Sequence, residues 1–488
     1  MKLKDLFDGL KIGGSTADMD SEASGVSYDS RRVKSGDVFV AVRGFNCDGH
    51  DHIADAAANG AVCVVTQDAA ADGLPYVSVE NTRAALAVLS ANLFGRPAEK
   101  LKIIGVTGTN GKTTVTYLIK EIIERATGAK TGLIGTIRNM VGAEELWAEF
   151  TTPESYELHE LFANMVGAGC EYAVMEVSSH ALALDRVYGI EFDVGVFTNL
   201  TSDHLDFHKS MEEYGDAKLK LFAQCRKAAV NLDDDFSRAV IDLLRENHAP
   251  LISFSTLHDE ADLVAKRIKL YSDRMEFCAL TIGVLQKVEL GIPGMFSVYN
   301  ALAATSAAML LGIDIQSAAA ALGECPGVPG RAEVVPTGGD FTVLIDYAHT
   351  PDALEKIIAS ARQGARGRVV TLFGCGGDRD KTKRPVMGEI AVRLSDFVIV
   401  TTDNPRTEAP DAIIGDILAG IDTANAPHIV IEDRREAIKW AIANSQTNDV
   451  LILAGKGHET YQILGTERVR FDEREVVAQA LAAAAEGI

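Results

Sequence analysis

Short apolar runs alternate with longer amphipathic stretches through most of the chain. In the middle third, the apolar runs span residues 103–106, 172–177, 194–198 and 228–231. The same alternation restarts further on, with apolar runs at 341–345, 369–373, 397–401, 429–431 and 450–453. Strands that alternate with helices predict a parallel β-sheet covered by helices on both faces. The pattern therefore predicts an α/β protein with two such sheets, one after the other.

The first hundred residues have a different pattern, with one helix expected near 82–94. Short strands are expected there at 38–42, 62–65 and 76–79. Segments 95–100 and 324–330 contain Gly and Pro in the proportions of linkers. Because 488 residues are too many for one core, we expect two to four domains.

Composition narrows the class of protein. A net charge of −22 argues against nonspecific binding to nucleic acid or to an anionic membrane. The seven cysteines are dispersed and form no Cys-x-x-Cys pair, which is typical of reduced thiols in a cytosolic protein. The N-terminus lacks the apolar core of a signal peptide, and the apolar run at 301–313 is too short to span a bilayer. We expect a cytoplasmic protein without membrane insertion or a nucleic-acid partner.

Residues 106–114, Val-Thr-Gly-Thr-Asn-Gly-Lys-Thr-Thr, lie between an apolar run and an amphipathic stretch at 115–123. A glycine-rich turn between a strand and a helix points backbone N–H groups and a helix N-terminus at an anion. Lys112 would neutralise terminal phosphates, and the Thr113 hydroxyl would hold Mg²⁺. Val106 occupies the position of the first Gly of the usual pattern, so this motif is a variant. It predicts ATP binding.

Polar clusters follow many of the expected strands, where ligands bind in sheets of this kind. They span 176–180, 199–206, 346–352, 374–380, 403–406 and 455–459. Glu176 and His204 are candidate metal ligands near the phosphate loop, with Asp203 and Asp206 as alternatives. Mg²⁺ prefers oxygen ligands, which favours Glu176 over His204.

Arg379 and Arg406 lie in separate loops, and arginine binds carboxylates through two parallel hydrogen bonds. Asp403 and Asn404 would hold an amine, so the set suits an amino acid. The alternative is an internal Asp–Arg pair that braces the turn at Pro405.

Residues 455–459, Gly-Lys-Gly-His-Glu, form the last of these clusters. Lys456 and His458 are candidate contacts for phosphate or carboxylate. Glu459 is a candidate acceptor for an ammonium group, and the alternative is that it caps a following helix.

These motifs together resemble the Mur ligases, the ATP-dependent enzymes that form the amide bonds of the peptidoglycan stem peptide. The resemblance covers the whole chain, through residues 28–41, 108–114, 151–153, 176–180, 203–206, 217–218, 299–300, 330–331, 346–351 and 403–406. Within the family, segments 28–41 and 403–406 resemble the branch that adds 2,6-diaminopimelate. The Gly-Thr-Asn-Gly-Lys motif also occurs in folylpolyglutamate synthases, which would not need the domain around Ser30.

The resemblance implies three α/β domains and a monomer. Residues 1–98 would bind the uridine nucleotide, and residues 99–330, with a P-loop-type parallel sheet, would bind ATP. Residues 331–488, with a Rossmann-like α/β fold, would bring in the amino acid and close on the others.

Family roles carried onto matching positions imply three sets of contacts. ATP would contact Gly108, Thr109, Asn110, Gly111, Lys112, Thr113, Thr114, Asn300, Arg331 and Asp346. The UDP-linked substrate would contact Ser30, Thr151, Thr152, Ser178 and Arg186. Diaminopimelate would contact Arg379, Asp403, Asn404, Pro405, Arg406, Gly455 and Glu459.

The resemblance also implies a modified lysine. Family members carbamylate the position of Lys218, which would then be an oxygen ligand for a second Mg²⁺, while Thr113, Glu176 and His204 would serve Mg²⁺ at the phosphate loop. Lys112 and Lys218 are therefore the expected catalytic residues. On local chemistry alone, Lys218 is an ordinary helix lysine with Lys220 nearby.

The implied reaction joins meso-diaminopimelate to the D-glutamate γ-carboxylate of UDP-MurNAc-L-Ala-D-Glu through an acyl phosphate. The alternative is the same ligation with L-lysine, which Arg406 disfavours because lysine lacks the second carboxylate. A catalytically silent nucleotide-binding protein is a further alternative. It would have lost the phosphate loop or the metal positions, yet Lys112, Thr113, Glu176 and Lys218 are all present.

Overall fold

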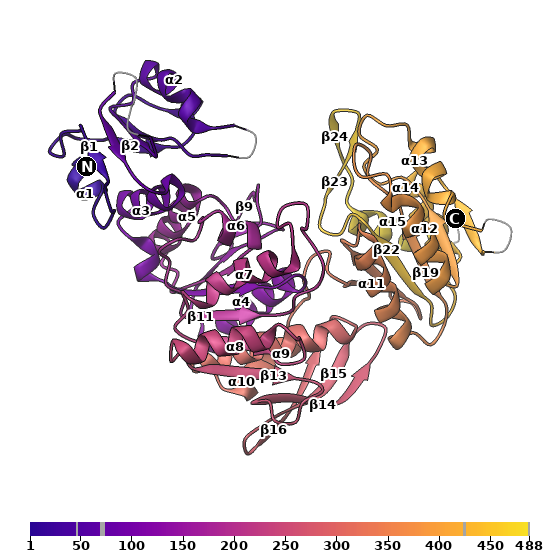
Figure 1. Cartoon of the computed structure of the whole chain (residues 1–488). Helices are drawn as coiled ribbons and strands as arrows, with labels where there is room; N and C mark the ends of the chain where they lie inside the picture. Colours follow the sequence, from indigo (N-terminus) through magenta and orange to yellow (C-terminus); the bar gives the residue numbers. More distant parts are fainter. Residues whose placement is uncertain (45–46, 69–73, 423–425, 487–488) are drawn as a thin grey trace. The chain divides into compact units, whose positions relative to one another are not determined.

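The computed structural model describes residues 1–44, 47–68, 74–422 and 426–486 (Figure 1). The chain forms two compact units, which we call unit 1 (residues 1–263 and 303–315) and unit 2 (residues 264–302 and 316–488). Both contain mostly parallel β-sheet and α-helices, which confirms the α/β class. The expected domain boundaries near residues 98 and 330 stay predictions.

The first sheet of unit 1 has the strand order β1-β5-β4-β3-β2. Its strands are β1 (Gly14–Ser15), β2 (Gly25–Ser27), β3 (Asp37–Val40), β4 (Cys63–Thr66) and β5 (Tyr76–Ser78). All neighbours pair parallel except β1 and β5. The accompanying helices are α1 (Leu3–Leu6), η1 (Ser30–Arg32), η2 (Gly49–His52), α2 (Ile53–Ala58), α3 (Thr82–Leu93) and η3 (Pro97–Lys100). Helix α3 begins as the sequence predicts, because the Asn81 side chain accepts hydrogen bonds from two N–H groups of the first turn.

The second sheet contributes to unit 1 the strands β13-β12-β11-β6-β10-β7-β8-β9, in this order. Its strands are β6 (Lys102–Thr107), β7 (Thr131–Ile134), β8 (Asn139–Val141), β9 (Glu144–Leu146), β10 (Tyr172–Glu176), β11 (Val194–Phe197), β12 (Ala228–Asn231) and β13 (Leu251–Ser255). The strands from β13 to β7 are parallel. The helices between them are α4 (Lys112–Thr127), α5 (Ser155–Gly167), α6 (Ser179–Ala183), α7 (Met211–Phe222) and α8 (Ser237–Glu246). The sequence analysis located β6, β10, β11 and β12 and missed the others.

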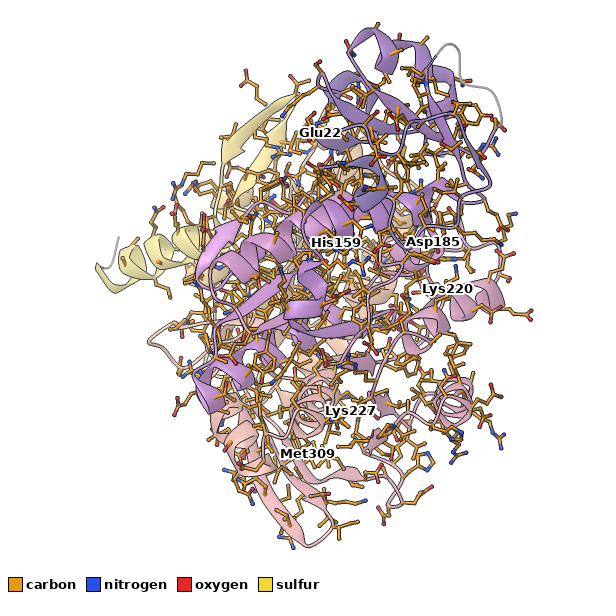
Figure 2. All side chains as sticks on the ribbon, turned by 90° about the vertical axis from the view of Figure 1, so that its left-hand side faces the viewer. Glu22, His159, Asp185, Lys220, Lys227 and Met309 are labelled. Atoms are coloured by element: carbon orange, nitrogen blue, oxygen red, sulfur yellow. The ribbon has the colours of Figure 1, made fainter. Side chains whose placement is uncertain are left out.

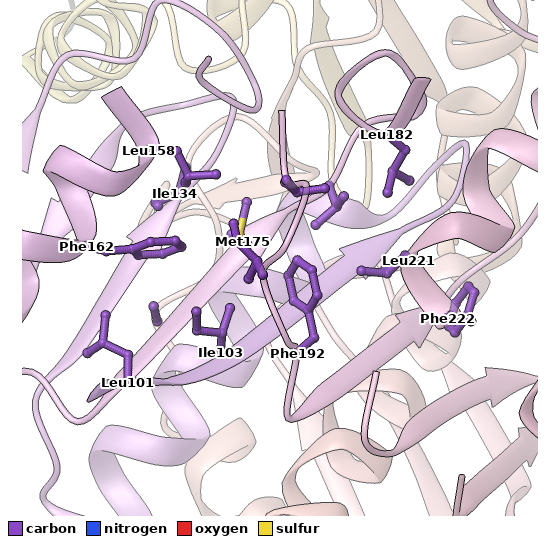
Figure 3. Packing of buried hydrophobic residues seen from close by; sticks show 14 of the residues in the cluster. Leu101, Ile103, Ile134, Leu158, Phe162, Met175, Leu182, Phe192, Leu221 and Phe222 are labelled. Carbon is purple, nitrogen blue, oxygen red and sulfur yellow. The ribbon is translucent and has the colours of Figure 1, made fainter. Parts of the chain in front are cut away.

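Apolar side chains from the central strands of this sheet form the core of unit 1. Figure 3 shows Ile103 of β6 and Met175 of β10 in one cluster with Phe192 and with Phe162 of α5. Each large side chain buried in this way contributes about 2 kcal/mol through the hydrophobic effect. A Cβ on Gly105 would lie 2.7 Å from the Phe192 ring, so only glycine lets the ring pack directly on β6. This packing fixes the strand that leads into the phosphate loop.

Unit 2 contains an antiparallel meander and a second parallel sheet. The meander consists of β14 (Leu263–Leu270), β15 (Met275–Thr281) and β16 (Val284–Leu290), which the sequence analysis did not predict. Helices α9 (Met295–Leu310) and α10 (Ile315–Gly323) follow in the chain.

The parallel sheet of unit 2 has the order β17-β18-β22-β19-β20-β21, and only β17 is antiparallel. Its strands are β17 (Glu333–Val335), β18 (Thr342–Asp346), β19 (Val369–Phe373), β20 (Phe397–Val400), β21 (His428–Val430) and β22 (Val450–Ala454). The sequence analysis located all of them but β17. The helices are α11 (Pro351–Gly364), α12 (Lys383–Leu394), α13 (Pro410–Leu418), α14 (Arg434–Ala443) and α15 (Glu473–Glu486), and a hairpin of β23 (Tyr461–Leu464) and β24 (Glu467–Arg470) precedes α15.

The strand order of this sheet explains where its polar loops meet. Strand β22 lies between β18 and β19, so the loops that follow β18, β22, β19 and β20 leave the same edge of the sheet. Those loops are 346–352, 455–459, 374–380 and 403–406, four of the clusters singled out in the sequence.

Candidate functional site

The phosphate loop joins β6 to α4 and depends on two glycines with positive φ. Gly108 has φ 147°, and a Cβ there would lie 1.9 Å from the Thr198 hydroxyl oxygen. Gly111 has φ 87° at the N-terminus of α4. Asn199 braces the loop, because its carbonyl accepts from Thr109 N at 2.8 Å and its side-chain oxygen accepts from Asn110 N at 3.0 Å. The glycines and the contacts with Asn199 therefore fix the backbone of the loop.

The lysine and the first threonine of α4 already have polar partners. Lys112 Nζ donates to the carbonyls of Gly108 and Thr109 at 2.9 and 2.8 Å. The Thr113 hydroxyl donates to Glu176 Oε2 at 3.1 Å. Thr114 is buried in the same turn. Residues Gly108 to Thr114 thus form one continuous site with Glu176.

Glu176 is the centre of a buried hydrogen-bond cluster at the end of β10. Its Oε1 accepts from Thr136 N at 2.8 Å, and its Oε2 accepts from the Thr136 hydroxyl at 3.1 Å. The Thr136 hydroxyl lies 3.0 Å from that of Thr151, and the Thr152 hydroxyl donates to Glu176 O at 2.8 Å. Carboxylate and hydroxyl oxygens are the donors that Mg²⁺ prefers, so Thr113 and Glu176 fit that ion. The sequence analysis missed Thr136, because no pattern in the neighbouring residues indicates that Thr136 contacts Glu176.

His204 lies against aromatic side chains rather than against Glu176. Its φ is 54°, and its ring centroid is 4.8 Å from that of His180 and 6.1 Å from that of Tyr214. Asp203 accepts from His204 N at 2.9 Å. In the described part of the chain, no group of three or more His, Cys, Asp or Glu side chains is arranged to hold a metal. A metal here would need further ligands from its substrates.

Lys218 is buried on α7, with its ammonium 4.3 Å from the centroid of the Tyr214 ring. Burial lowers the pKa of Lys218 well below its usual range, and the charge of Lys112 lowers it further. Lys220, on the same helix, is half exposed and lies 3.9 Å from Asp185 (Figure 2). The two lysines share a helix and differ in environment, which the sequence does not reveal.

Four of the five residues expected at the UDP-linked substrate lie together. The Thr152 hydroxyl lies 3.3 Å from that of Ser178, which caps α6. Arg186 donates to Thr152 O at 2.9 Å and pairs with Glu154 at 2.8 Å. Thr151 joins them through Thr136, so this set is continuous with the Glu176 cluster.

Ser30, the fifth residue, lies in the N-terminal sheet region. It is buried at the start of η1, and its carbonyl accepts from Asn59 Nδ2 at 2.9 Å. The neighbouring Tyr28 hydroxyl donates to Glu157 of α5 at 2.8 Å, which ties this region to the segment that contains Thr151 and Thr152.

The three residues expected at the nucleotide in unit 2 are buried or braced by neighbours. Asp346 accepts from Ala332 N at 2.7 Å and from Ala348 N at 2.8 Å, and burial raises the pKa of its carboxyl. The Arg331 guanidinium lies 5.3 Å from the centroid of the Tyr347 ring. Asn300 is buried in α9. Asp346 therefore holds the segment after Arg331 against the end of β18.

Arg379 and Arg406 both have side-chain atoms next to Gly376. A Cβ on Gly376 would lie 2.9 Å from Arg406 Nη1 and 3.8 Å from Arg379 Cγ. Arg406 Nη1 donates to Gly377 O at 2.8 Å, and Arg379 Nη1 donates to Asp378 O at 3.1 Å. Both guanidinium groups retain further donors. The alternative of an internal Asp403–Arg406 pair is wrong, since Asp403 faces Lys456 instead.

A buried arginine that the sequence analysis missed holds these two loops together. Arg384 pairs with Glu408 at 2.8 Å and with Asp416 at 2.8 Å, and it donates to Gly376 O at 3.2 Å. Glu408 in turn accepts from Asp378 N at 2.6 Å. Hydrogen bonds from Arg384 lower the pKa of Glu408 to about 2. A charged Arg384–Glu408 pair therefore braces both arginine-bearing loops.

Two carboxylates and an amide oxygen surround the ammonium of Lys456. Lys456 Nζ lies 3.1 Å from Asn404 Oδ1, 3.0 Å from Glu459 Oε2 and 3.5 Å from Asp403 Oδ1. Gly455 has φ 114°, and a Cβ there would lie 2.7 Å from Asp403 Oδ2. Lys456 is fully buried and its ammonium contacts side chains of the protein, so the expectation that it contacts phosphate or carboxylate of a ligand stays a prediction. Glu459 caps no helix, because β23 follows it.

Comparison with protein families gives three successive matches. Residues 22–93 match the model described as "Mur ligase family, catalytic domain". Residues 106–308 match "Mur ligase middle domain", and residues 330–457 match "Mur ligase, glutamate ligase domain". Three matched domains in this order confirm the expected three-domain α/β organisation.

Similar proteins cover nearly the whole chain. The UDP-N-acetylmuramoyl-L-alanyl-D-glutamate–2,6-diaminopimelate ligase of Caldanaerobacter subterraneus subsp. tengcongensis is 48% identical over 99% of both chains. Ligase 1 of the same name from Clostridium acetobutylicum is 46% identical over 98% of this chain and 99% of that protein.

Solved structures extend the comparison. A ligase with the same printed name is 31% identical, covers 99% of both chains and superposes with a TM-score of 0.75. A folylpolyglutamate synthase from Mycobacterium tuberculosis, 17% identical over 83% of this chain and 95% of its own, shares the fold with a TM-score of 0.61. Among the described residues, no helix is long and apolar enough to cross a membrane.

Proposed function

Because the chain belongs to the Mur ligase family, we propose that it joins meso-diaminopimelate to UDP-MurNAc-L-Ala-D-Glu at the expense of ATP. The new amide bond forms at the γ-carboxylate of the D-glutamate. The product is a cytoplasmic precursor of peptidoglycan. One observation carries the choice of amino acid: two arginines have side-chain atoms next to Gly376, and the same domain contains the acidic cluster of Asp403 and Glu459.

The phosphate loop supplies the activation step. The D-glutamyl γ-carboxylate attacks the γ-phosphorus of ATP, which yields an acyl phosphate and ADP. The amine of the diamino acid then attacks the acyl carbon, and inorganic phosphate leaves. Lys112 exchanges the loop carbonyls for phosphate oxygens and stabilises the charge that grows on them. Backbone N–H groups of residues 108–114 hold the remaining phosphate oxygens, and Asn300, Arg331 and Asp346 position the rest of ATP.

Mg²⁺, when bound, would neutralise charge on the transferred phosphoryl group. Thr113 and Glu176 would hold it through oxygen atoms that already lie 3.1 Å apart. Phosphate oxygens would complete the set. His204 is a further candidate ligand, and the carbamate of Lys218 would be an oxygen ligand for a second Mg²⁺.

The environment of Lys218 supports its carbamylation. A neutral amine attacks carbon dioxide, forms an N–C bond and releases one proton, whereas an ammonium group has no lone pair for this step. Because burial lowers the pKa of Lys218, its amine is neutral at a lower pH than the amine of an exposed lysine. The carbamate carries a negative charge and two oxygen donors, so the modification inverts the charge of the side chain.

Two further sets of residues bind the other two substrates. Thr151, Thr152, Ser178 and Arg186 contact the muramoyl-dipeptide portion, and Ser30 contacts the uridine nucleotide. On the amino acid, Arg379 and Arg406 bind the far carboxylate, while Asp403 and Glu459 lie on the side of the far ammonium. Lysine lacks that carboxylate and would leave a guanidinium unpaired, so the L-lysine alternative is disfavoured.

The test is phosphate release with purified protein, ATP, Mg²⁺ and UDP-MurNAc-L-Ala-D-Glu. Phosphate release should require meso-diaminopimelate, and mass spectrometry should find the UDP-linked tripeptide. Phosphate release without added amino acid, or a product of another mass, would contradict the proposal.

A further inference from the structure

We propose that Lys456 is a positioning residue that presents one oxygen of Glu459 to the ammonium group at the far end of the diamino acid. The inference rests on the proposed function and concerns how the acidic side of the pocket is held. Lys456 itself does not touch the substrate. Its ammonium is fully buried and is used inside the protein.

The position of the Lys456 ammonium is fixed by three neighbours. Lys456 follows β22, and its Nζ contacts Asn404 Oδ1 at 3.1 Å, Glu459 Oε2 at 3.0 Å and Asp403 Oδ1 at 3.5 Å. A buried charge is costly unless it is paired and hydrogen-bonded, so the side chain has no comparable alternative position.

Lys456 also fixes the orientation of the Asn404 amide. An ammonium can only donate, so Asn404 Oδ1 must face it, and Oδ1 also accepts from Ile463 N at 3.0 Å. The amide nitrogen therefore points the other way and donates to Glu459 Oε2 at 2.9 Å. Asn404 acts as a brace between the lysine, the hairpin and the glutamate.

These contacts leave the two oxygens of Glu459 in different states. Oε2 accepts from both Lys456 and Asn404. Oε1 accepts from no side chain or backbone group in the described parts of the chain, and the side chain is 15% exposed. A carboxylate held by one oxygen with the other open is arranged to accept a hydrogen bond from a ligand.

The charges around Lys456 indicate the sign of that ligand. The cluster contains two buried cations, Lys456 and Arg434, two buried carboxylates, Asp403 and Glu473, and the half-buried carboxylate of Glu459, with Arg434 and Glu473 paired at 2.8 Å. One negative charge is left over, and one ammonium group would balance it. Without Lys456, two negative charges would be left, and Glu459 would lose the contact that sets its rotamer.

The test compares two amino acids in the Lys456→Met variant, which keeps the length of the side chain and removes its charge. Racemic 2-aminopimelate keeps both carboxylates and one amine but lacks the far ammonium. Wild type should prefer meso-diaminopimelate in kcat/KM by at least about 100-fold. In Lys456→Met the preference should fall at least about tenfold, through a raised KM for diaminopimelate. The kcat/KM for 2-aminopimelate and the KM for ATP should stay near wild type.

Lys439→Met is the matched control, because Lys439 is a half-exposed lysine of α14 that pairs with Glu436. It should keep the wild-type preference. If Lys456→Met does not fold, Glu459→Gln provides a second test. It should lose the preference for meso-diaminopimelate over 2-aminopimelate in the same way.

Three results bear on the inference in different ways. An unchanged preference in Lys456→Met or Glu459→Gln would overturn it. An equal loss with both amino acids would also overturn it, because it would indicate a merely structural role. A wild-type protein that does not use diaminopimelate at all would instead refute the proposed function.

Discussion

The phosphate loop gathers its binding groups within residues 108–114, whereas the amino-acid pocket collects its groups from loops that follow three different strands. In the loop, the shape comes from Gly108 and Gly111, and the groups expected to bind phosphate are mainly backbone N–H groups. In the pocket, the binding groups are charged side chains held by other buried charges, such as Arg384 and Lys456. A local site of the first kind is specified by a short motif, while a site of the second kind is specified by the fold.

The comparison predicts different failures when each region is mutated. Damage to the loop should stop the chemistry for every amino acid. Damage to the pocket should change which amino acid is used and leave phosphoryl transfer possible.

The largest effect is expected from Lys112→Ala. The lysine stabilises charge that grows during phosphoryl transfer, so kcat should fall by roughly 1,000-fold with the fold intact. Steady-state phosphate release and circular dichroism measure the two quantities. Near-normal turnover would remove the phosphate loop from the mechanism.

Lys218→Ala should come next, with a loss of about 100-fold or more, because a metal ligand disappears. Lys220→Ala is the matched control on the same helix and should stay close to wild type. Intact-protein and peptide mass spectrometry at neutral pH should find the carbamate, 44 Da above lysine by the mass of carbon dioxide, on Lys218. Finding unmodified Lys218 together with an active Lys218→Ala would contradict the account.

The carbamate also predicts a dependence on pH and bicarbonate. The lowered pKa of Lys218 means that the amine becomes protonated only when the pH falls well below the usual range of lysine. Below that point carbamylation fails, because the ammonium form cannot attack carbon dioxide. Activity lost in acid and in carbon-dioxide-free buffer should return when bicarbonate is added at neutral pH. Activity that is indifferent to bicarbonate after such treatment would argue for an unmodified lysine.

Arg406→Ala should weaken the binding of the amino acid and leave the other two substrates unaffected. The KM for diaminopimelate should rise about 10- to 100-fold, since a charged hydrogen-bonding partner of the far carboxylate is lost. The preference over lysine should narrow, and the KM values for ATP and the UDP-linked substrate should move little. Arg393→Ala, at a half-exposed arginine of α12, is the control. Full discrimination in Arg406→Ala would refute the specificity assignment but not the ligase assignment.

Arg384→Met should have the smallest effect on turnover. It removes the buried cation between Glu408, Asp416 and Gly376, so the two arginine-bearing loops lose their brace. We expect the melting temperature to fall by several degrees and the KM for diaminopimelate to rise a few-fold below that temperature. Equal melting curves for variant and wild type would show that the loops are held by other contacts.

The sequence predicts the parts of the fold that depend on local pattern. Strand β6, the glycine loop and α4 follow from apolar periodicity and two glycines. The meander of β14 to β16 was missed, because its strands mix exposed charges such as Lys287 with buried residues and contain few turn signals. Strand β7 was missed because its sequence, Thr-Gly-Leu-Ile, contains only two large apolar side chains and forms no apolar run.

The candidate site also has parts that the sequence predicts and parts that only the structure reveals. Thr113 and Glu176 were expected near one ion, and they lie in contact. The contact of Thr136 with Glu176 depends on pairing between β7 and β10, which no local pattern encodes. Burial of Lys218, Arg384 and Lys456 depends on what packs over them, so their roles are visible only in the structure.

The most direct measurement of the central claim is a competition in one vessel. Purified protein, ATP, Mg²⁺ and UDP-MurNAc-L-Ala-D-Glu would be incubated with equal concentrations of meso-diaminopimelate and L-lysine, and the UDP-linked products would be separated by mass. We expect almost all of the UDP-linked product to be the diaminopimelate tripeptide, formed in an amount equal to that of ADP. A substantial lysine tripeptide, or ADP formed without either product, would contradict it.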